Sequence, residues 1–244
     1  MIEKINWYKN WFNSPFYPIL YHNRDARDAR VLLDNLIERL EIHPDSRILD
    51  LACGRGRHSV YLNMKGYDVT GLDMSKSSIL EASLNINTML RFLVGDMRFI
   101  PYTAQFDYVL NLFTSFGYFE DEADHLRTLE SIKGALKPGG IFILDFFNAT
   151  KLLNTLVEEE KKEVQGITFH IARSLVDNKI RKQIEFEHDG SDYYFEESVE
   201  AFTLKDFESL IEKCGFKILE TFGDYELNPY SEQESERIIL IAQA

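Results

Sequence analysis

This chain of 244 residues has little of several features that define other protein classes. It has only two cysteines, Cys53 and Cys214, far apart in the sequence, which argues against a disulfide framework or a zinc site and fits a reducing compartment. It has no uninterrupted apolar stretch long enough to span a bilayer, and its N-terminus lacks the apolar core of a signal peptide. We therefore expect a cytoplasmic protein with no membrane partner.

Positive charge is also scarce. The chain has 27 Lys and Arg against 40 Asp and Glu, a formal net charge of −13. A surface this acidic repels phosphate backbones, and no local basic patch compensates for it. Nucleic acid is therefore a disfavoured partner.

Apolar residues are plentiful, at 45% of the chain, which is enough to bury a full core. Between residues 47 and 146, short apolar segments alternate with segments of helical periodicity. This alternation predicts a doubly wound α/β fold, in which helices cover both faces of a parallel sheet. The predicted strands are 47–51, 68–72, 92–95, 106–112 and 141–146, and the predicted helices between them are 58–65, 75–90 and 121–136.

The pattern changes towards the C-terminus. Apolar and polar residues alternate with period two over 163–202, and the pairs Asp177-Asn178 and Asp189-Gly190 are typical of tight turns. We therefore expect a small antiparallel β insertion there. The charged run 158–163 is interpreted as the solvated end of a helix. A helix over 204–214 and strands at 216–221 and 237–242 are expected to complete the core.

These changes divide the chain into a lid segment over 1–46, a ligand-binding core over 47–150, a β insertion over 151–202 and a closing part over 203–244. The lid segment is rich in aromatic residues, which either exclude water from a ligand or simply cap the sheet. The insertion is expected to form a wall of a substrate pocket, to make a homodimer contact, or only to widen the sheet.

A glycine turn follows the first predicted strand. Asp50 lies near the end of the strand, Gly54 and Gly56 form the turn, and Asp73 closes the next strand. Glycines permit positive φ and let a ligand approach the free N–H groups of the following helix. A carboxylate such as Asp73 can accept both ribose hydroxyls of a nucleoside. The layout predicts an adenosine-containing ligand at the carboxyl edge of the sheet.

Two ligands of this kind compete. A dinucleotide fold has a third glycine three residues after Gly56, where this chain has Ser59. The acid Asp50 would repel a pyrophosphate and favours a cationic group instead, such as the amino group of a methionine moiety. The residues therefore favour S-adenosylmethionine over a nicotinamide dinucleotide.

Five segments together carry a family resemblance, namely DLACGRG, VTGLDMS, VGDMRFIP, FDYVLNLFTSFGYF and LKPGGIFILDFFN. They resemble the motifs of class I S-adenosylmethionine-dependent methyltransferases over residues 47–148, with Ala52 in place of the first of three usual glycines. The resemblance implies a Rossmann-like seven-stranded sheet with a parallel core and an antiparallel final strand. It also implies that residues 47–150 bind S-adenosylmethionine.

The resemblance implies roles for single residues as well. Asp73 would bond the ribose and Asp96 the adenine amino group, while Met74 and Met97 would pack on the adenine ring. Cys53 is expected to be a packing residue, and no metal is expected. The predicted cofactor-binding set is Asp50, Ala52, Cys53, Gly54, Gly56, Asp73, Met74, Asp96, Met97, Asn111, Tyr17 and Tyr21.

The methyl acceptor is expected at the carboxyl ends of the fourth and fifth predicted strands. Methyl transfer from a sulfonium is an in-line displacement, so alignment of the nucleophile is the main requirement. We predict that Asn111 and Tyr118 are the catalytic residues that position the acceptor, and we assign no general base. Other candidates for acceptor contact are Phe113, Ser115, Phe116, Asp145 and Asn148.

The sequence therefore predicts a methyltransferase of a small-molecule acceptor, with N, O, S or C as the nucleophile. This choice follows from the acidic surface and the small accessory segments. RNA or protein methylation and non-catalytic binding of S-adenosylmethionine are the alternatives, although no nucleic-acid module or regulatory domain is apparent.

Overall fold

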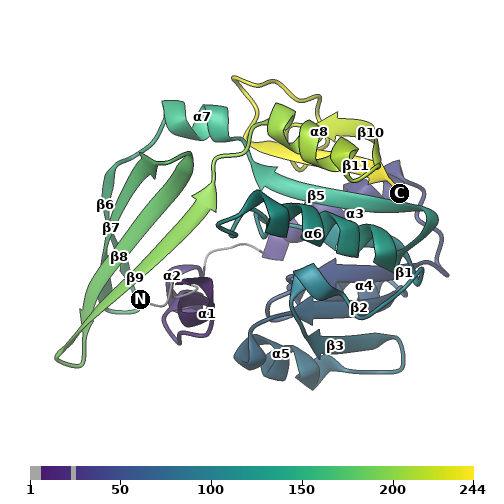
Figure 1. Cartoon of the computed structure of the whole chain (residues 1–244). Helices are drawn as coiled ribbons and strands as arrows, with labels where there is room; N and C mark the ends of the chain where they lie inside the picture. Colours follow the sequence, from purple (N-terminus) through teal and green to yellow (C-terminus); the bar gives the residue numbers. More distant parts are fainter. Residues whose placement is uncertain (1–6, 23–25) are drawn as a thin grey trace.

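The computed structural model describes residues 7–22 and 26–244, and Figure 1 shows its two sheets with the N-terminal helices between them. The helices are α1 (Trp7–Phe12), α2 (Tyr17–Leu20), α3 (Ala26–Arg39), α4 (Arg57–Met64), α5 (Lys76–Ala82), α6 (Glu122–Ala135), α7 (Ala149–Asn154) and α8 (Leu204–Lys213), with 3₁₀ turns η1 (Ser83–Asn85) and η2 (Met97–Phe99). The seven-stranded sheet contains β1 (Arg47–Leu51), β2 (Asp68–Asp73), β3 (Leu90–Val94), β4 (Phe106–Asn111), β5 (Leu136–Phe147), β10 (Lys217–Phe222) and β11 (Arg237–Gln243). The four-stranded sheet contains β6 (Glu159–Val164), β7 (Ile167–Val176), β8 (Lys179–His188) and β9 (Ser191–Glu200).

The larger sheet has the strand order β10-β11-β5-β4-β1-β2-β3. Its strands β1 to β5 are parallel, whereas β11 runs antiparallel to both of its neighbours. The chain moves outward from β1 to β3 and then returns to β4 on the other side of β1, so the winding direction reverses between β1 and β4. The predicted fold class is confirmed, and this reversal is where such sheets bind ligands.

The two faces of the larger sheet carry separate apolar cores. Along β11, Ile238 and Leu240 belong to one core and Ile239 and Ile241 to the other, as the two-residue period of a strand requires. The first core packs on α6 and α8, and the second packs on α3 and α4. Helices therefore cover both faces, which leaves the carboxyl edge of the strands as the place for a site.

The smaller sheet is an antiparallel meander, as predicted for the insertion. Both predicted turns are confirmed, because Asp177, Asn178, Asp189 and Gly190 have φ values of 51°, 60°, 51° and 72°. Positive φ at both central residues is the geometry of a type I′ hairpin. Two tight hairpins thus join β7 to β8 and β8 to β9.

The interpretation of 158–163 as a helix end is wrong, because this run forms the edge strand β6, paired with β7. Its inward positions include Glu160 and Lys162, so the period of two is hidden in a run of charges. Glu160 forms an ion pair with Arg173 at 2.6 Å, and Lys162 donates to the Leu20 carbonyl at 3.2 Å. These partners are distant in sequence, which is why the charges alone did not reveal a strand.

Some element ends differ from the sequence-based expectation. Ser75 caps α5 by accepting a hydrogen bond from Ser78 N at 3.2 Å, as predicted, but the helix ends at Ala82 and not near residue 90. The segment that follows must turn back so that Leu90 can pair with Val69 of β2. Sheet pairing therefore decides where the helix stops.

The smaller sheet holds the N-terminal helices in place. Trp11, Phe16 and Leu20 are buried against its inner face, which presents Phe169 and Ile184 among other apolar side chains. Figure 1 shows α1 and α2 beside β9, on the side that faces the larger sheet. The insertion therefore supports the segment that was predicted to be a lid.

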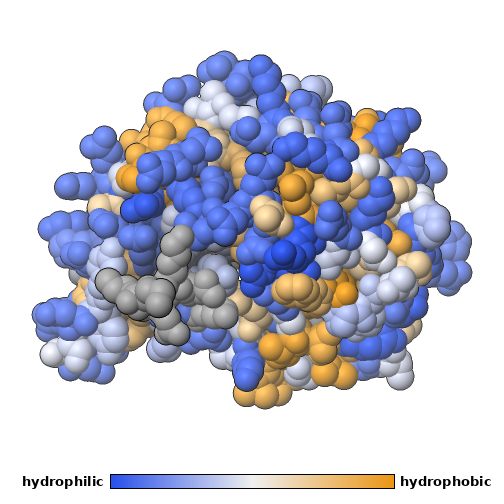
Figure 2. All heavy atoms as spheres, viewed as in Figure 1, coloured by the Kyte–Doolittle hydropathy of each residue, from blue (hydrophilic) through white to orange (hydrophobic). Residues whose placement is uncertain are grey.

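Figure 2 shows a largely polar surface with an apolar area at its lower edge, over α5 and β3. Leu80 of α5 and Val94 of β3 are exposed. Among residues 7–22 and 26–244, no helix has the length and apolar character needed to cross a membrane.

Candidate active site

A cavity of about 370 Å³ lies at the carboxyl ends of β1 to β4, which is within the size range of small-ligand sites. The N-terminal helices cover it, with Tyr8, Phe12, Tyr17 and Tyr21 among the lining residues. The core contributes residues at and beyond the carboxyl ends of four strands, in loops and in the first turns of helices: Ala52, Cys53, Gly54, Arg55, Arg57 and His58 after β1, Asp73, Met74, Ser75, Ser77 and Ser78 at and after β2, Gly95, Asp96 and Met97 after β3, and Leu112, Phe113, Ser115, Tyr118 and Phe119 after β4.

Asp73 closes β2 and faces the cavity with a carboxylate that two backbone groups orient. One oxygen accepts from Gly54 N at 2.8 Å and the other accepts from Ser75 N at 2.7 Å. Burial raises the pKa of the Asp73 carboxyl, and these two N–H groups oppose that shift. Each oxygen keeps a further lone pair, so the carboxylate can accept a diol such as the two ribose hydroxyls.

The turn after β1 brings its backbone against the cavity. Ala52 has φ of 59°, in the left-handed region that a glycine would adopt without cost. At Gly54, φ is 55°, and a Cβ built there would meet no heavy atom within 4 Å, which leaves room for a ligand. Burial raises the pKa of the Cys53 thiol above its ordinary value, in keeping with a packing residue.

Close packing, rather than access of a ligand, requires a glycine at position 56. Its φ is 80°, and a Cβ would lie 2.7 Å from the Phe92 ring and 3.2 Å from Ala82 Cβ. The turn therefore sits directly on β3 and α5, and no side chain fits between them.

Asp50 was predicted to attract a cationic group of the ligand, but it lies beneath the turn and is not among the described residues that line the cavity. Its side chain accepts from Ser59 Oγ at 2.6 Å. Burial raises the pKa of the Asp50 carboxyl to about 6 against the hydrogen bond from Ser59. Ser59, which replaces the third glycine of a dinucleotide fold, is thus the partner of Asp50. Any action of Asp50 on a ligand passes through the turn.

The raised pKa predicts a pH-dependent stability. The ordinary value is 3.8, so from about pH 4 to about pH 6 the unfolded chain loses this proton first and the fold loses stability as pH rises. Asp50→Asn lacks the charge but keeps an oxygen for Ser59. We expect the variant to be more stable than the wild type by about 3 kcal/mol above pH 7, with no difference below about pH 4. Denaturant unfolding without ligand across this range measures the effect. A gap independent of pH would contradict it.

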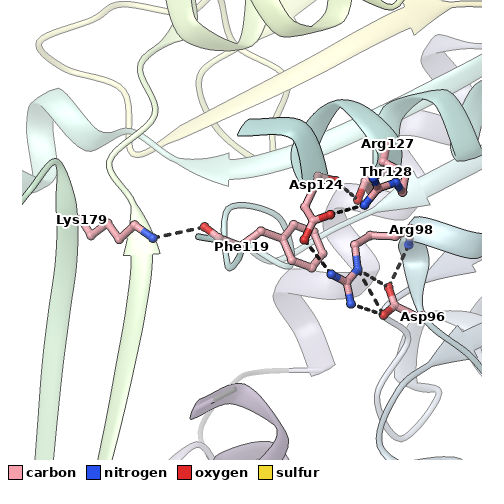
Figure 3. Close-up of polar contacts among 7 residues, drawn as sticks. All are labelled: Asp96, Arg98, Phe119, Asp124, Arg127, Thr128 and Lys179. Atoms are coloured by element: carbon pink, nitrogen blue, oxygen red, sulfur yellow. Dashed lines mark hydrogen bonds and ion pairs between the residues drawn. The ribbon is translucent and has the colours of Figure 1, made fainter. Parts of the chain in front are cut away.

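Asp96 lines the cavity but already has a cationic partner. Figure 3 shows the Arg98 guanidinium between the carboxylates of Asp96 and Asp124. The ion pairs measure 2.6 Å to Asp96 and 2.7 Å to Asp124. Asp96 also accepts from Arg98 N at 2.9 Å, which caps η2. The hydrogen bond from the adenine amino group to Asp96 stays a prediction. The ion-pair network holds the Asp96 carboxylate just beyond the carboxyl end of β3, beside Met97.

The predicted acceptor residues fall into two groups. Phe113, Ser115 and Tyr118 line the cavity, and Tyr118 donates a hydrogen bond to the Thr114 carbonyl. Asn111 is fully buried and donates to the Leu51 carbonyl at 3.2 Å, so it joins β4 to β1 rather than lining the described cavity. The other three candidates, which also do not line it, are buried: Phe116, Asp145 and Asn148.

Tyr17 and Tyr21 of the predicted lid both line the cavity, and their contact with the cofactor stays a prediction. Glu197 of β9 accepts hydrogen bonds from the Tyr21 hydroxyl and, at 2.6 Å, from Trp11 Nε1. None of the described lining residues belongs to 151–202, so the insertion does not form a cavity wall itself. It acts on the cavity through α1 and α2.

Sequence reasoning missed Tyr8, Phe12 and Arg57. The two aromatic residues belong to the same N-terminal segment as Tyr17, and helical spacing from Tyr8 to Phe12 was the available signal. The Arg57 guanidinium lies 4.4 Å from the centre of the Phe113 ring. Burial lowers the pKa of the neighbouring residue, His58, to about 3, so its imidazole is neutral.

The residues fit S-adenosylmethionine. Asp73 offers a preoriented acceptor for the ribose, the open space at Gly54 admits a ligand against backbone N–H groups, and the aromatic lid suits a sulfonium. Met74 and Met97 flank the acids at the ends of β2 and β3, where a flat ring could pack.

Comparisons with known proteins agree with this fit. Residues 48–140 match the family described as Methyltransferase domain. A Bacillus subtilis (strain 168) protein assigned as a methyltransferase, YqeM, is 31% identical over 207 residues, covering 81% of this chain and 83% of its own. A glycine/sarcosine N-methyltransferase of Parasynechococcus marenigrum (strain WH8102) is 30% identical over 203 residues, covering 79% and 71%.

Solved structures show the same fold. An S-adenosylmethionine-dependent methyltransferase from Clostridium acetobutylicum ATCC 824 superposes with a TM-score of 0.79 at 21% identity, covering 96% of this chain and 98% of that one. The fold, the cofactor cavity and the relatives lead to one conclusion. This chain belongs to the class I S-adenosylmethionine-dependent methyltransferases and is an enzyme of that family.

Proposed function

We propose that this methyltransferase acts on a small molecule with a nucleophilic amine. The observation that carries the proposal is the aromatic lining of the cavity, to which the N-terminal segment contributes Tyr8, Phe12, Tyr17 and Tyr21 and the loop after β4 contributes Tyr118. A cavity of about 370 Å³ that also receives the cofactor leaves room for a compact acceptor. Aromatic faces stabilise nearby positive charge, which is present in the sulfonium and develops on a methylated amine.

The names of the relatives support nitrogen as the accepting atom. Three relatives from different organisms are named glycine/sarcosine N-methyltransferases, and they are 29% to 30% identical to this chain. The net charge of −13 disfavours RNA as the acceptor. An amine of low molecular weight is the acceptor class that agrees with both facts.

The chemistry needs alignment more than covalent help. S-adenosylmethionine supplies an electrophilic methyl group when bound, and an amine must meet it as the uncharged base. Tyr118 and the lid tyrosines would orient the amine and exclude water from the cavity. The neutral His58 adds no positive charge that would repel a protonated acceptor.

The test is formation of the demethylated cofactor across a panel of primary and secondary amines, hydroxy compounds and thiols. We expect at least one amine to raise product formation about tenfold or more over buffer, with mass spectrometry locating the methyl group on nitrogen. Turnover only with RNA or protein would contradict the proposal. Tight binding of S-adenosylmethionine without turnover on any acceptor would instead indicate a sensor.

The lid can be tested separately through Glu197. Glu197→Ala removes the acceptor shared by Trp11 Nε1 and the Tyr21 hydroxyl, so α1 and α2 lose their anchor on β9. We expect KM for the acceptor to rise about tenfold, because a loosened lid holds the acceptor less well. Steady-state kinetics with the amine found above measure this.

The matched control is Glu196→Ala, which removes an acid from the opposite face of the same strand, where its partner is Tyr194. The control should keep the wild-type KM. An equal rise in both variants would mean that β9, rather than the lid anchor, was damaged.

A further inference from the structure

The turn after β4 has an unusual backbone. Phe113 and Thr114 have φ values of 57° and 60°, so two consecutive non-glycine residues adopt the left-handed conformation. Such residues are strained, and they persist only where surrounding contacts determine them. This turn carries Phe113 and Ser115 into the cavity and is followed by Tyr118, which also lines it.

A buried carboxylate holds this turn from below. Asp145 of β5 is completely buried, and its side chain accepts from Phe113 N at 2.8 Å. Its backbone carbonyl accepts from Thr114 N at 2.9 Å. Both strained residues therefore donate their N–H groups to one residue of the neighbouring strand, which accounts for the conformation of both.

A cation from β11 completes the arrangement. Arg237 Nε donates to Asp145 Oδ1 at 2.7 Å, and its Nη2 donates to Thr114 Oγ1 at 3.1 Å. The Tyr225 hydroxyl approaches Asp145 Oδ2 at 3.4 Å. The Asp145 carboxylate is fully buried, whereas the Arg237 side chain is 18% exposed. Arg237 supplies the cation that compensates for burial of this carboxylate, so the pair depends on its hydrogen-bond geometry.

The turn passes this geometry on to the cavity. The Thr114 carbonyl accepts the hydrogen bond from the Tyr118 hydroxyl, so the left-handed conformation of Thr114 sets the orientation of that hydroxyl. The Phe113 ring is held between the His58 ring at 5.0 Å and the Tyr225 ring at 5.5 Å.

We infer that the ion pair between the buried Asp145 and Arg237 is a positioning device for the acceptor side of the site, acting through the strained Phe113–Thr114 turn on the Tyr118 hydroxyl. Neither charged residue is among the described residues that line the cavity, so both act on the cavity indirectly, through the turn. The inference rests on methyl transfer as the activity and uses the proposed amine acceptor only for its kinetic test.

Asp145→Asn separates the two duties of the carboxylate. A carboxylate has one oxygen for Arg237 and another for Phe113 N, whereas an amide has a single oxygen and an NH₂ group that would face a donor. We expect crystals of the variant with the demethylated cofactor to show Thr114 outside the left-handed region and Tyr118 displaced. This readout requires no acceptor.

Kinetics provide the second readout. We expect kcat to fall about 30-fold while the calorimetric affinity for the demethylated cofactor stays within about threefold, because the cofactor is held by the loops after β1, β2 and β3. Adding Thr114→Gly, which removes the cost of positive φ, should restore kcat about fivefold in the Asp145→Asn background. Arg237→Lys keeps the charge but loses the paired donors, and it is the milder variant if Asp145→Asn does not fold.

An unchanged turn in the variant crystals would overturn the inference, and so would a loss of cofactor affinity as large as the loss of kcat. If no small amine is a substrate, the proposed acceptor is wrong, but the conformation of the turn and the cofactor affinity still decide the role of Asp145.

Discussion

Asp73→Ala is expected to weaken binding of S-adenosylmethionine and of its demethylated product about 1,000-fold. The ribose would lose a charged acceptor for two hydroxyls, and hydrogen bonds to charged groups contribute roughly 2 kcal/mol each, or about 4 kcal/mol together. The variant also leaves the N–H groups of Gly54 and Ser75 without the carboxylate to which they donate in the wild type. Calorimetry with the demethylated product measures the affinity without turnover.

Asp68→Ala is the matched control, because Asp68 begins the same strand that Asp73 ends. Its carboxylate pairs with Arg47 and Arg91 at the opposite edge of the sheet. We expect its cofactor affinity to equal that of the wild type. Unchanged affinity in Asp73→Ala, or equal losses in both variants, would show that the adenosine does not lie at the end of β2.

Gly56→Ala is expected to destabilise the fold by about 4 kcal/mol. Part of this is the cost of φ at 80° for a residue with a side chain, and the larger part is the overlap of the new Cβ with the Phe92 ring at 2.7 Å. The ring cannot move away easily, because it also packs on Gly71 of β2, where an added Cβ would lie 2.5 Å from the same ring. Denaturant unfolding without ligand measures the loss.

Gly54→Ala separates backbone strain from overlap in the same turn. Gly54 also has a positive φ, but its Cβ would enter open space, so the stability loss should be only about 1 kcal/mol. Ala52 already shows that this turn tolerates a methyl side chain at φ of 59°. Because the new methyl group projects into the cavity, cofactor binding should nevertheless fall strongly. Equal stability losses for Gly54→Ala and Gly56→Ala would contradict the assigned role of Phe92.

The two glycines thus divide the work of one motif. Gly56 is required for packing of the turn on β3, and Gly54 is required for access of the ligand. Asp50 and Ser59 form a third contribution, a buried hydrogen bond that ties the end of β1 to the start of α4. Within this motif, packing of the turn and access of the ligand therefore depend on different residues.

Much of the fold could be predicted from periodicity. Parallel strands buried on both faces have short apolar sequences, and hairpin turns need residues that accept positive φ, so the strands and the turns at Asp177 and Asp189 were identified. The strand β6 was missed because its inward side chains are charged and are satisfied by Arg173 and Leu20, both outside the segment. The sequence of a segment does not show which residues elsewhere in the chain will pair with its charged side chains.

The same limit applies to the site. Asp73 and Met74 follow from a strand end, Tyr17 and Tyr21 from aromatic density, and Asp96 and Met97 from the family resemblance. All six residues line the cavity. Asn111 and Asp145 also lie near strand ends, yet both side chains point into the fold. Successive residues of a strand face opposite sides, so a shift of one position decides between cavity and core.

By itself, the sequence determined the succession of strands and helices over 47–146 through its periodicity. The glycine turn and its acids determined the class of ligand and indicated the carboxyl edge of the sheet as its place. Only the tertiary structure decided which carboxylates face the cavity, because Asp50, Asp73 and Asp145 each follow a leucine near a strand end and are distinguished by the partners that packing gives them. It also decided that the insertion supports the lid, since that role arises where β9 meets Trp11 and Tyr21 across the length of the chain. The physical reason is that burial and hydrogen bonding are properties of the packed chain, whereas periodicity and turn chemistry are properties of its segments.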